Sequence, residues 1–540
     1  MSDFDAIFVG GGHHSLIAAC YLAKAGMRVI VLERRHEVGG GLCTEEIIIP
    51  GFRHNLHSAF HSGSKTGWLW FRDLDLESYG VEYIRPDVNN AMPLSDGRCL
   101  VMYKDPRRTA KEIERFSKRD GGTYLKMYEF FQRLVVKGGL RYEDFCPPIP
   151  TYEREELLKR SELGREYWRI MNMEPRQYFD ELFEDEHLKA MLLFNLVVTA
   201  TSDDLPDHRG WVVKATLGTT RMGLCRGGSH RLAHGLARCL LANGGMILEN
   251  SHVERILIKD GVAHGVRLKD GREITSKIVV SGVDPKQTML KLVGEEHLDG
   301  DLVRKVRAVK EGFRSILFGV HLALNEAPKY RCADFNPDVN AAFEYNIGYE
   351  VPERLQEHWR EIEAGVAPRN PAAQCGVFTL FDKTQAPPGK HTAFFWQYVP
   401  YHLKDGGAEM WDEFKEEYMD LCLEKWREYA PNLTDENILG RYAYTPLDIT
   451  RKIINMLEGD WSIIAVHPDQ NYDRRPVPEL AQGRTPIKNL YITGAGLNPG
   501  GSIHGSAGYF VAGVIADDLG VEKWWTPPDL KQIYGHLAEV

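Results

Sequence analysis

The sequence lacks any apolar run long enough to cross a bilayer, which takes about 20 residues. It has no basic segment followed by an apolar one at its start, so no secretory signal is expected. Its nine cysteines are scattered, and no two of them form a CxxC pair. We therefore expect free thiols in a reducing cytoplasm, and neither a zinc nor an iron–sulfur site.

A surplus of basic residues is also missing. Lys and Arg number 66 against 76 Asp and Glu, which gives a formal net charge of −10. Because phosphate binding needs a basic surface, a nucleic-acid partner is not expected. The mean hydropathy of −0.34 gives little sign of a membrane-docking face, although peripheral membrane contact stays open. Nothing in the sequence indicates an oligomeric state.

The chain opens on a strand, a glycine turn, a helix and a second strand. Residues 5–9 and 28–32 are short apolar runs, and 15–25 carries apolar residues on one helical face, with Gly26 at its end. This βαβ pattern is typical of a Rossmann-like nucleotide-binding domain. Because 540 residues are too many for one hydrophobic core, we predict an α/β protein with a second, mixed α+β domain and a helical insertion.

The predicted domains are interleaved along the chain. Amphipathic helical stretches dominate 76–225, and from Gly227 the pattern returns to a glycine turn, a helix and short strands. A strand and a long glycine-rich bend follow near 489–505. We assign 1–75, 226–300 and 456–540 to the nucleotide-binding domain, and 76–225 and 301–455 to a substrate-binding domain with a helical portion.

Gly10-x-Gly12-x-x-Ser15 occupies the turn between the first strand and the helix. The first glycine allows the tight turn, the second lets the backbone approach a pyrophosphate at the helix N-terminus, and the third position needs a small residue for packing. Glu33 ends the second strand about twenty residues later, where a carboxylate accepts hydrogen bonds from a ribose. A dinucleotide site is therefore predicted.

Further glycines favour flavin over nicotinamide. Gly39-Gly40-Gly41 forms a second loop close to Glu33, and Gly494, Gly496, Gly500 and Gly501 let backbone amides approach the rest of an extended nucleotide. A second strand–GxGxxG–helix unit with its own acid is missing. We therefore expect FAD as the redox cofactor and no separate NAD(P)H site.

Several motifs carry a family resemblance. They are Val9-Gly-Gly-Gly-His-His-Ser-Leu, Val31-Leu-Glu-Arg-Arg, Gly227-Gly-Ser-x-x-Leu, Val253-x-x-Ile256, Thr485-Pro-Ile-Lys-Asn-Leu-Tyr-Ile-Thr-Gly494 and Pro499-Gly-Gly-Ser-Ile-His-Gly505. Together they resemble the phytoene desaturase-like branch of the flavin amine oxidase superfamily. His14 and Ser15 stand where that branch has Asn and Gly.

The resemblance implies a glutathione reductase-like FAD domain and an extended, non-covalent FAD. It implies contacts with Gly10, Gly12, Glu33, Arg34, Gly40, Val253, Gly494 and Ile503. To these we add His13, Ser15, Gly41 and Gly501 from the glycine loops. The resemblance also implies hydrogen transfer between a carbon–carbon bond and the flavin.

Two histidines are predicted to act in catalysis. His504 lies in the glycine-rich bend expected beside the flavin, and an ordinary histidine pKa of about 6.5 suits acid/base work. A histidine that only braces this loop is the alternative. His57 follows the second glycine loop and is expected to face the flavin or to pack in the core. No third ligand accompanies His57 and His61, so a metal site is not expected.

For the substrate, we select Trp396 and Tyr398, which strand alternation places on one face, and Arg221, which is suited to an anionic group. Core packing for the two aromatic residues, and neutralisation of nearby carboxylates for Arg221, are the alternatives. The pair Asp203-Asp204 is interpreted as a solvated turn.

The leading hypothesis is an FAD-dependent desaturase or dehydrogenase. It would oxidise a C–C bond to C=C in an apolar or cyclic substrate (a polyene, an isoprenoid, or a ketone- or acyl-activated compound), and pass electrons to O2 or a quinone. Alternatives are a flavin-dependent isomerase or saturase, an amine oxidase, and a non-enzymatic FAD-bound scaffold or chaperone. A substrate smaller than a C40 polyene is favoured.

Overall fold

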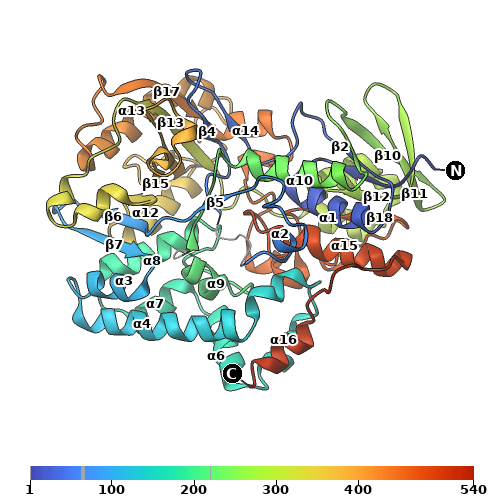
Figure 1. The fold of residues 1–540 in the computed structure, drawn as a ribbon, viewed down its shortest axis with the longest axis horizontal. Helices are drawn as coiled ribbons and strands as arrows, with labels where there is room; N and C mark the ends of the chain where they lie inside the picture. Colours follow the sequence, from blue (N-terminus) through green and yellow to red (C-terminus); the bar gives the residue numbers. More distant parts are fainter. Residues whose placement is uncertain (1, 62–66, 219–220, 540) are drawn as a thin grey trace.

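The computed structural model describes residues 2–61, 67–218 and 221–539. Two β-sheets lie side by side, with a helical region below the second of them (Figure 1). Within the described chain, no helix is both long and apolar enough to pass through a bilayer.

The first sheet runs in the order β10-β11-β12-β1-β2-β9. Strand β18 pairs with the end of β12 on the side away from β1. Its strands are β1 (Phe4–Val9), β2 (Val29–Leu32), β9 (Met246–Leu248), β10 (Val253–Lys259), β11 (Val262–Leu268), β12 (Glu273–Ser281) and β18 (Leu490–Ile492). Strands β12, β1, β2, β9 and β18 are parallel, and β10–β11 is an antiparallel hairpin that extends the sheet. Segments at both ends of the chain and in its middle therefore share one sheet.

Helix α1 (His13–Lys24) packs between α10 (His230–Ala242) and α15 (Ser506–Leu519) against this sheet (Figure 1). Nearly all of α1 is buried, from His13 to Ala23, because its two helical neighbours cover the faces that the sheet leaves open. The start of α1 is thus fixed at the carboxyl end of β1, next to the start of α15.

The second sheet runs in the order β17-β13-β16-β15-β14-β6-β7. Its strands are β6 (Val88–Pro93), β7 (Cys99–Tyr103), β13 (Leu317–Leu324), β14 (Glu344–Ile347), β15 (Ala373–Gly376), β16 (His391–Tyr398) and β17 (Ile438–Tyr444). Helix α13 (Trp411–Tyr429) covers one face, where Trp411 and Trp426 pack on Phe318 and Phe395. The opposite face carries Trp396 and Tyr398, which line a cavity shared with residues of the first sheet.

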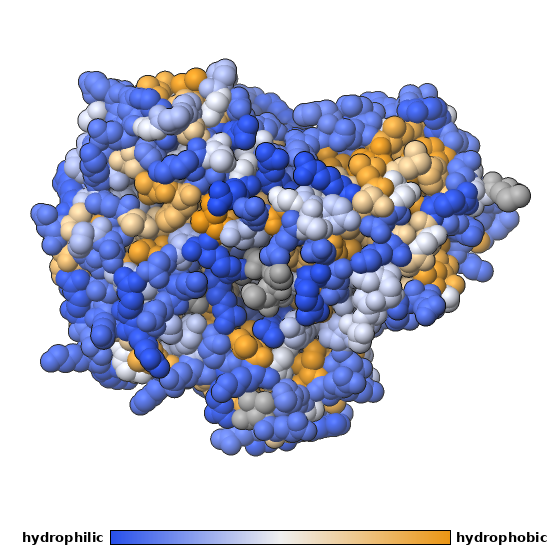
Figure 2. Space-filling model, in the orientation of Figure 1, coloured by the Kyte–Doolittle hydropathy of each residue, from blue (hydrophilic) through white to orange (hydrophobic). Residues whose placement is uncertain are grey.

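The helical region is formed mostly from residues between β7 and β8 (Leu224–Cys225). Its helices are α3 (Pro106–Ile113), α4 (Lys118–Gln132), α5 (Thr151–Leu158), α6 (Glu162–Met171), α7 (Pro175–Leu182), α8 (Glu186–Val197) and α9 (Trp211–Gly218). Ser117, Ser161 and Asp185 each accept a hydrogen bond from the backbone N–H three residues later, which starts α4, α6 and α8. Figure 2 shows hydrophilic side chains over most of this region.

Two features differ from the sequence-based description. Asp203 is fully buried, where it accepts a hydrogen bond from Trp359 Nε1 at 2.9 Å, so the solvated turn predicted there was wrong. Helix α16 (Leu530–His536) packs into the helical region, with Leu530, Ile533 and Tyr534 in its core, although 456–540 was assigned to the nucleotide-binding domain. The domain boundaries stay a prediction.

Candidate functional site

A single cavity of about 500 Å³ links the two sheets. One end is lined by Glu33 and Arg34, which follow the carboxyl end of β2, and by Val253, the first residue of β10. The other end is lined by Trp396 and Tyr398 on the inner face of the second sheet. The cavity also contacts every predicted cofactor-binding residue: Gly10, Gly12, His13, Ser15, Glu33, Arg34, Gly40, Gly41, Val253, Gly494, Gly501 and Ile503. The sequence therefore selected residues that share one cavity, and their contact with a cofactor stays a prediction.

The turn before α1 is shaped to receive an anion. Gly10 has φ +89, a conformation that favours glycine, and Gly12 caps the helix without a side chain of its own. The first-turn N–H groups of α1 have no intrahelical acceptor, and no acidic residue neutralises the positive end of the helix. A Cβ on Gly12 would meet no protein atom within 4 Å, because the space beyond it belongs to the cavity.

Glu33 is held firmly at the end of β2. Its carboxylate oxygens accept hydrogen bonds from the backbone N–H of Gly11 at 2.7 Å and of Arg35 at 2.8 Å, and the residue is 8% exposed. These bonds join the glycine turn to the acid, so the turn and the predicted ribose contact form one unit.

Ser15 fits where a smaller residue is typical because Gly282 makes room for it. A Cβ on Gly282, just after β12, would lie 2.1 Å from Ser15 Oγ. Close packing of the helix on the strand normally requires a glycine in the helix. Here Gly282, on the strand side, leaves the space that Ser15 occupies.

Several buried polar atoms beside the glycine turn have no partner among the described residues. They are His13 Nε2, His14 Nε2, Ser15 Oγ and Thr493 Oγ1. The backbone N–H of Gly508 donates to His14 Nδ1 at 3.2 Å, so His14 carries its hydrogen on Nε2 as a free donor. Such unpaired groups beside a helix N-terminus fit a phosphate-bearing cofactor, whose oxygens would accept these hydrogen bonds.

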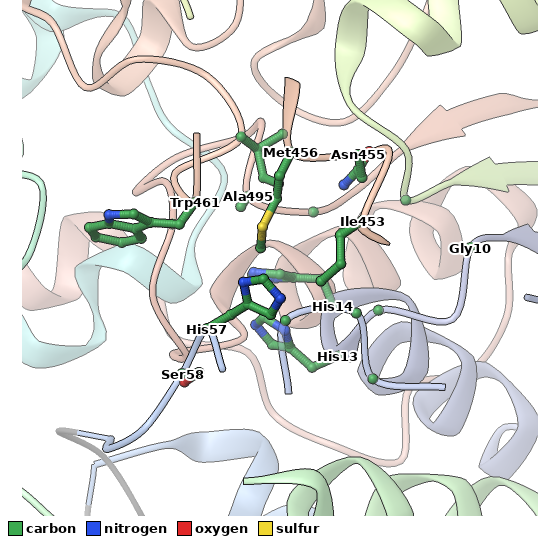
Figure 3. Close-up of a pocket in the computed structure, with 18 of the residues that line it drawn as sticks. Gly10, His13, His14, His57, Ser58, Ile453, Asn455, Met456, Trp461 and Ala495 are labelled. Carbon is green, nitrogen blue, oxygen red and sulfur yellow. The ribbon is translucent and has the colours of Figure 1, made fainter. Parts of the chain in front are cut away.

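The imidazoles of His13, His14 and His57 gather at the middle of the cavity, opposite Met456 and Ile453 (Figure 3). Burial lowers the pKa of His13 to about 4 and that of His57 to about 3. The pKa of His14 is also lowered well below its usual range, first by burial and then by the neighbouring His13. All three rings are therefore neutral at pH 7 and act as hydrogen-bonding groups rather than cations.

The two predicted catalytic histidines occupy different positions. His57 lines the cavity, and its Nε2 lies 3.0 Å from the hydroxyl of Tyr444. His504 lies behind the cavity wall, where Nδ1 pairs with Ser506 and Nε2 with the carbonyl of Gly501, both at 3.1 Å. Both ring nitrogens of His504 are used by its own loop, which favours the bracing role, and its part in catalysis stays a prediction.

Of the predicted substrate-binding residues, Trp396 and Tyr398 line the cavity and Arg221 does not. The hydroxyl of Tyr398 donates to the carbonyl of Val197 at 3.0 Å, so this residue offers the cavity mainly its ring. Arg221 lies next to the cavity residue Met222, and its carbonyl accepts a hydrogen bond from Arg85. The geometry gives Arg221 no direct place at the substrate end.

The cavity residues that sequence reasoning missed include His14, Gln374, Trp461 and the segment Ile453–Met456. Position 14 was noticed only as a departure from the family pattern. Gln374 and Trp461 belong to no local motif and reach the cavity through the pairing of distant strands and loops. In the described residues no cluster of three metal-ligating side chains occurs, and all nine cysteines are free and buried.

Comparison with known proteins gives concordant matches. Residues 16–327 match the family described as flavin containing amine oxidoreductase. A limonene dehydrogenase component of Castellaniella defragrans is 32% identical, over 97% of this chain and 96% of its own length. A lycopene-forming phytoene desaturase of Pseudescherichia vulneris is 23% identical, over 95% of this chain and 99% of its own. A solved structure of a putrescine oxidase variant covers 96% of this chain and 98% of its own with a TM-score of 0.59, and at 14% identity it shows the fold alone.

Proposed function

Because this chain belongs to the flavin-containing amine oxidoreductase family and FAD is its cofactor, we propose that it is a dehydrogenase that converts a C–C bond to C=C in an apolar, cyclic substrate. The observation that carries this proposal is the continuous cavity, which joins the nucleotide end to an aromatic wall on the second sheet. The similarity to a protein named as part of a limonene dehydrogenase supports a substrate of this kind.

The size of the cavity favours a compact substrate. A volume of about 500 Å³ is in the range of ordinary small-molecule sites, and a cofactor and a substrate have to share it. Apolar side chains dominate the substrate end, among them Met222, Leu317 and Trp396. These walls and this volume support a ring-sized apolar skeleton rather than a long polyene as the proposed substrate.

FAD, when bound, supplies a two-electron acceptor for a hydride from carbon. In this chain Gly10, Gly12 and the start of α1 would hold its pyrophosphate, and Glu33 its adenosine ribose. Gly494, Gly501 and Ile503 would lie against the remainder. The aromatic wall orients the substrate and excludes water from the reacting carbons.

His57 is the residue best placed to meet the proton that leaves with the hydride. It is neutral, it lines the cavity, and Tyr444 holds one of its ring nitrogens at 3.0 Å. When Nε2 donates to Tyr444, the lone pair on Nδ1 remains available for a proton. Tyr444 then orients the imidazole, as a second group commonly does for a general base.

Anaerobic mixing of the FAD-loaded protein with cyclic hydrocarbons, cyclic ketones and amines tests this function. We expect a cyclic compound to bleach the oxidised-flavin absorbance and to yield a product lighter by two hydrogens. Reoxidation by O2 is then compared with reoxidation by a quinone, to identify the electron acceptor. An unchanged flavin spectrum with every compound, or a product of unchanged mass, would contradict a dehydrogenase.

A further inference from the structure

A row of buried polar side chains lies on the cavity face of the second sheet. Asn90 of β6, Glu344 and Asn346 of β14, and Gln374 of β15 are each no more than 5% exposed. The strand register places Glu344 beside Asn90 and Asn346 beside Gln374. Asn195 of α8 closes the row, because its amide oxygen accepts hydrogen bonds from Asn90 at 3.1 Å and from Asn346 at 3.3 Å. An apolar sheet face would need none of these groups.

Glu344 is a carboxyl group with no charged partner in the described part of the chain. One of its oxygens accepts a hydrogen bond from Gln374 Nε2 at 3.1 Å, and the other is buried with no partner among the described residues. Burial raises the pKa of Glu344 to about 8. The polar groups that strand pairing brings to it are Gln374 and Asn90, while Tyr345 and Cys375 point to the opposite face. At neutral pH this side chain is therefore mainly the carboxylic acid, which can donate an O–H.

Gln374 connects this acid to the cavity. Its side chain lines the cavity beside Trp396, its neighbour across the β15–β16 pair. One end of the amide is hydrogen-bonded to Glu344, and the amide of Gln374 has no other partner in the described part of the chain. In the structure the amide N–H points to Glu344, and a half-turn of the amide exchanges its nitrogen and oxygen. An ionised Glu344 can only accept and therefore holds the N–H, whereas the carboxylic acid can also pair with the amide oxygen. When the acid donates its O–H to the amide oxygen after this half-turn, the N–H is left for the cavity, whereas the carboxylate keeps the N–H and leaves the oxygen.

The surroundings select against a charged ligand group. Trp396, Leu317 and Met222 are apolar, and the hydroxyl of Tyr398 is already bonded to Val197. An ammonium group would need an ionised carboxylate, and a carboxylate ligand would need a cation; this end of the cavity supplies neither in its described lining. One uncharged hydrogen-bonding atom on an apolar skeleton is the complement of this wall.

We propose that Gln374, positioned by Glu344, binds an uncharged oxygen of an otherwise apolar ring, so that the protein prefers oxygenated cyclic compounds, ketones above all, to the parent hydrocarbons. This inference rests on the proposed function and specifies its substrate class. Gln374 is the residue that touches the substrate, and Glu344 acts through it. A carbonyl oxygen accepts the amide N–H, and an oxygen at this position also polarises the neighbouring C–H bond that has to break.

Two probes with one skeleton test the proposal. Limonene and carvone share a ring and its substituents, and carvone has one additional ketone oxygen. Their dissociation constants are measured on the FAD-loaded protein from the perturbation of the flavin spectrum, without requiring turnover. We expect carvone to bind at least about 10-fold more tightly, since a site with a buried polar group disfavours the analogue that lacks the partner.

Variants separate the roles of the two residues. Gln374→Met keeps the length of the side chain and removes the amide, so the carvone-to-limonene ratio should fall to about one while limonene still binds. Glu344→Gln keeps a donor toward Gln374 and should retain the ratio. In the unmodified protein the preference for carvone should fade as the pH rises through about 8, and in Glu344→Gln it should not. FAD content and melting temperature report whether each variant folds.

Equal binding of the two probes, binding of neither, or an unchanged ratio in Gln374→Met would overturn the inference, as would tighter binding of cyclohexylamine than of carvone. The proposed function fails separately, when no cyclic compound of any kind reduces the flavin. A protein that oxidises limonene and carvone with equal ease would keep the function and lose the inference.

Discussion

The two ends of the cavity are built in different ways. At the nucleotide end, backbone groups of Gly10, Gly12 and the first turn of α1 face the cavity, and Glu33 locks the turn through two backbone hydrogen bonds. At the substrate end, side chains from separate strands form the wall, with Gln374, Trp396 and Tyr398 on β15 and β16. The first end depends on local chain geometry, and the second on the register of a sheet assembled from distant segments.

Because of this difference, the affinity for the cofactor and the choice of substrate depend on different residues. A backbone site tolerates few substitutions at its glycines, because any side chain occupies space that the cofactor needs. A side-chain wall can change residue by residue while the strands beneath it stay paired. Substitutions at the nucleotide end should therefore remove FAD, and substitutions on the wall should leave FAD bound and alter which compounds bind.

Gly12→Val should have the largest effect. The new side chain projects into the cavity rather than into protein, so the chain should fold and FAD should bind at least about 100-fold more weakly, which corresponds to about 2.8 kcal/mol. FAD titration of the purified variant gives the dissociation constant. Gly122→Val, at an exposed position of α4, is the matched control and should keep the cofactor. Full flavin occupancy in Gly12→Val would refute the assignment of the glycine turn.

Glu33→Gln should weaken FAD binding about 10-fold, or roughly 1.4 kcal/mol. The amide has a single acceptor oxygen, so one of the N–H groups of Gly11 and Arg35 loses its partner, and the ribose loses a charged acceptor. The exposed Glu249→Gln should leave the affinity unchanged. If both variants bind FAD equally well, Glu33 is only a structural brace for the turn.

His504→Asn should change the acid sensitivity of folding. Burial lowers the pKa of His504 to about 3 in the folded protein. Below about pH 6.5 this imidazole is therefore protonated in the unfolded chain but stays neutral in the folded one. Stability due to this group is complete above pH 6.5 and falls by up to about 1.4 kcal/mol per pH unit as the pH drops toward 3.

The measurement is the free energy of unfolding between pH 6.5 and 4.5, where the variant should show a shallower slope. With FAD bound, the variant should also be reduced by substrate at an unchanged rate, because both ring nitrogens of His504 already serve the loop. Slower reduction at full FAD occupancy would return His504 to a catalytic role.

Trp396→Phe should have the smallest effect. Loss of about 40 Å² of apolar contact corresponds to about 1 kcal/mol, or roughly 5-fold weaker binding of a cyclic substrate, with the FAD affinity unchanged. Phe395→Leu, one residue away on the opposite face against Trp426, should lower the melting temperature and leave substrate affinity intact. The comparison between the two ends fails if Trp396→Phe releases FAD.

The sequence also predicted the nucleotide end of the cavity better than the substrate end. The fold class, the resemblance to the flavin amine oxidase superfamily and the FAD cofactor are confirmed, because their signals are short motifs whose spacing reflects local geometry. Strands β1 and β2, helix α10 after Gly227 and strand β18 near residue 489 lie where glycines and apolar runs indicated.

The helical and substrate regions were harder to predict. Within 76–225, predicted only as helical stretches, Ser161 and Asp185 begin the separate helices α6 and α8, and hydrophobic periodicity alone does not reveal these breaks. Strands β6 and β7 join the second sheet through pairing with β14, far along the chain. Gln374 has no neighbour in sequence that marks it, and its role depends on Glu344 across a strand pair.

A density map of the FAD-bound protein tests the central claim most directly, namely that one nucleotide extends along the cavity from the first sheet to the second. We predict that the adenosine ribose lies against Glu33, the pyrophosphate against Gly12 and the start of α1, and the flavin ring between Gly494–Ile503 and the wall that carries Trp396. FAD density in another orientation, or away from Glu33 and Gly12, would contradict this account.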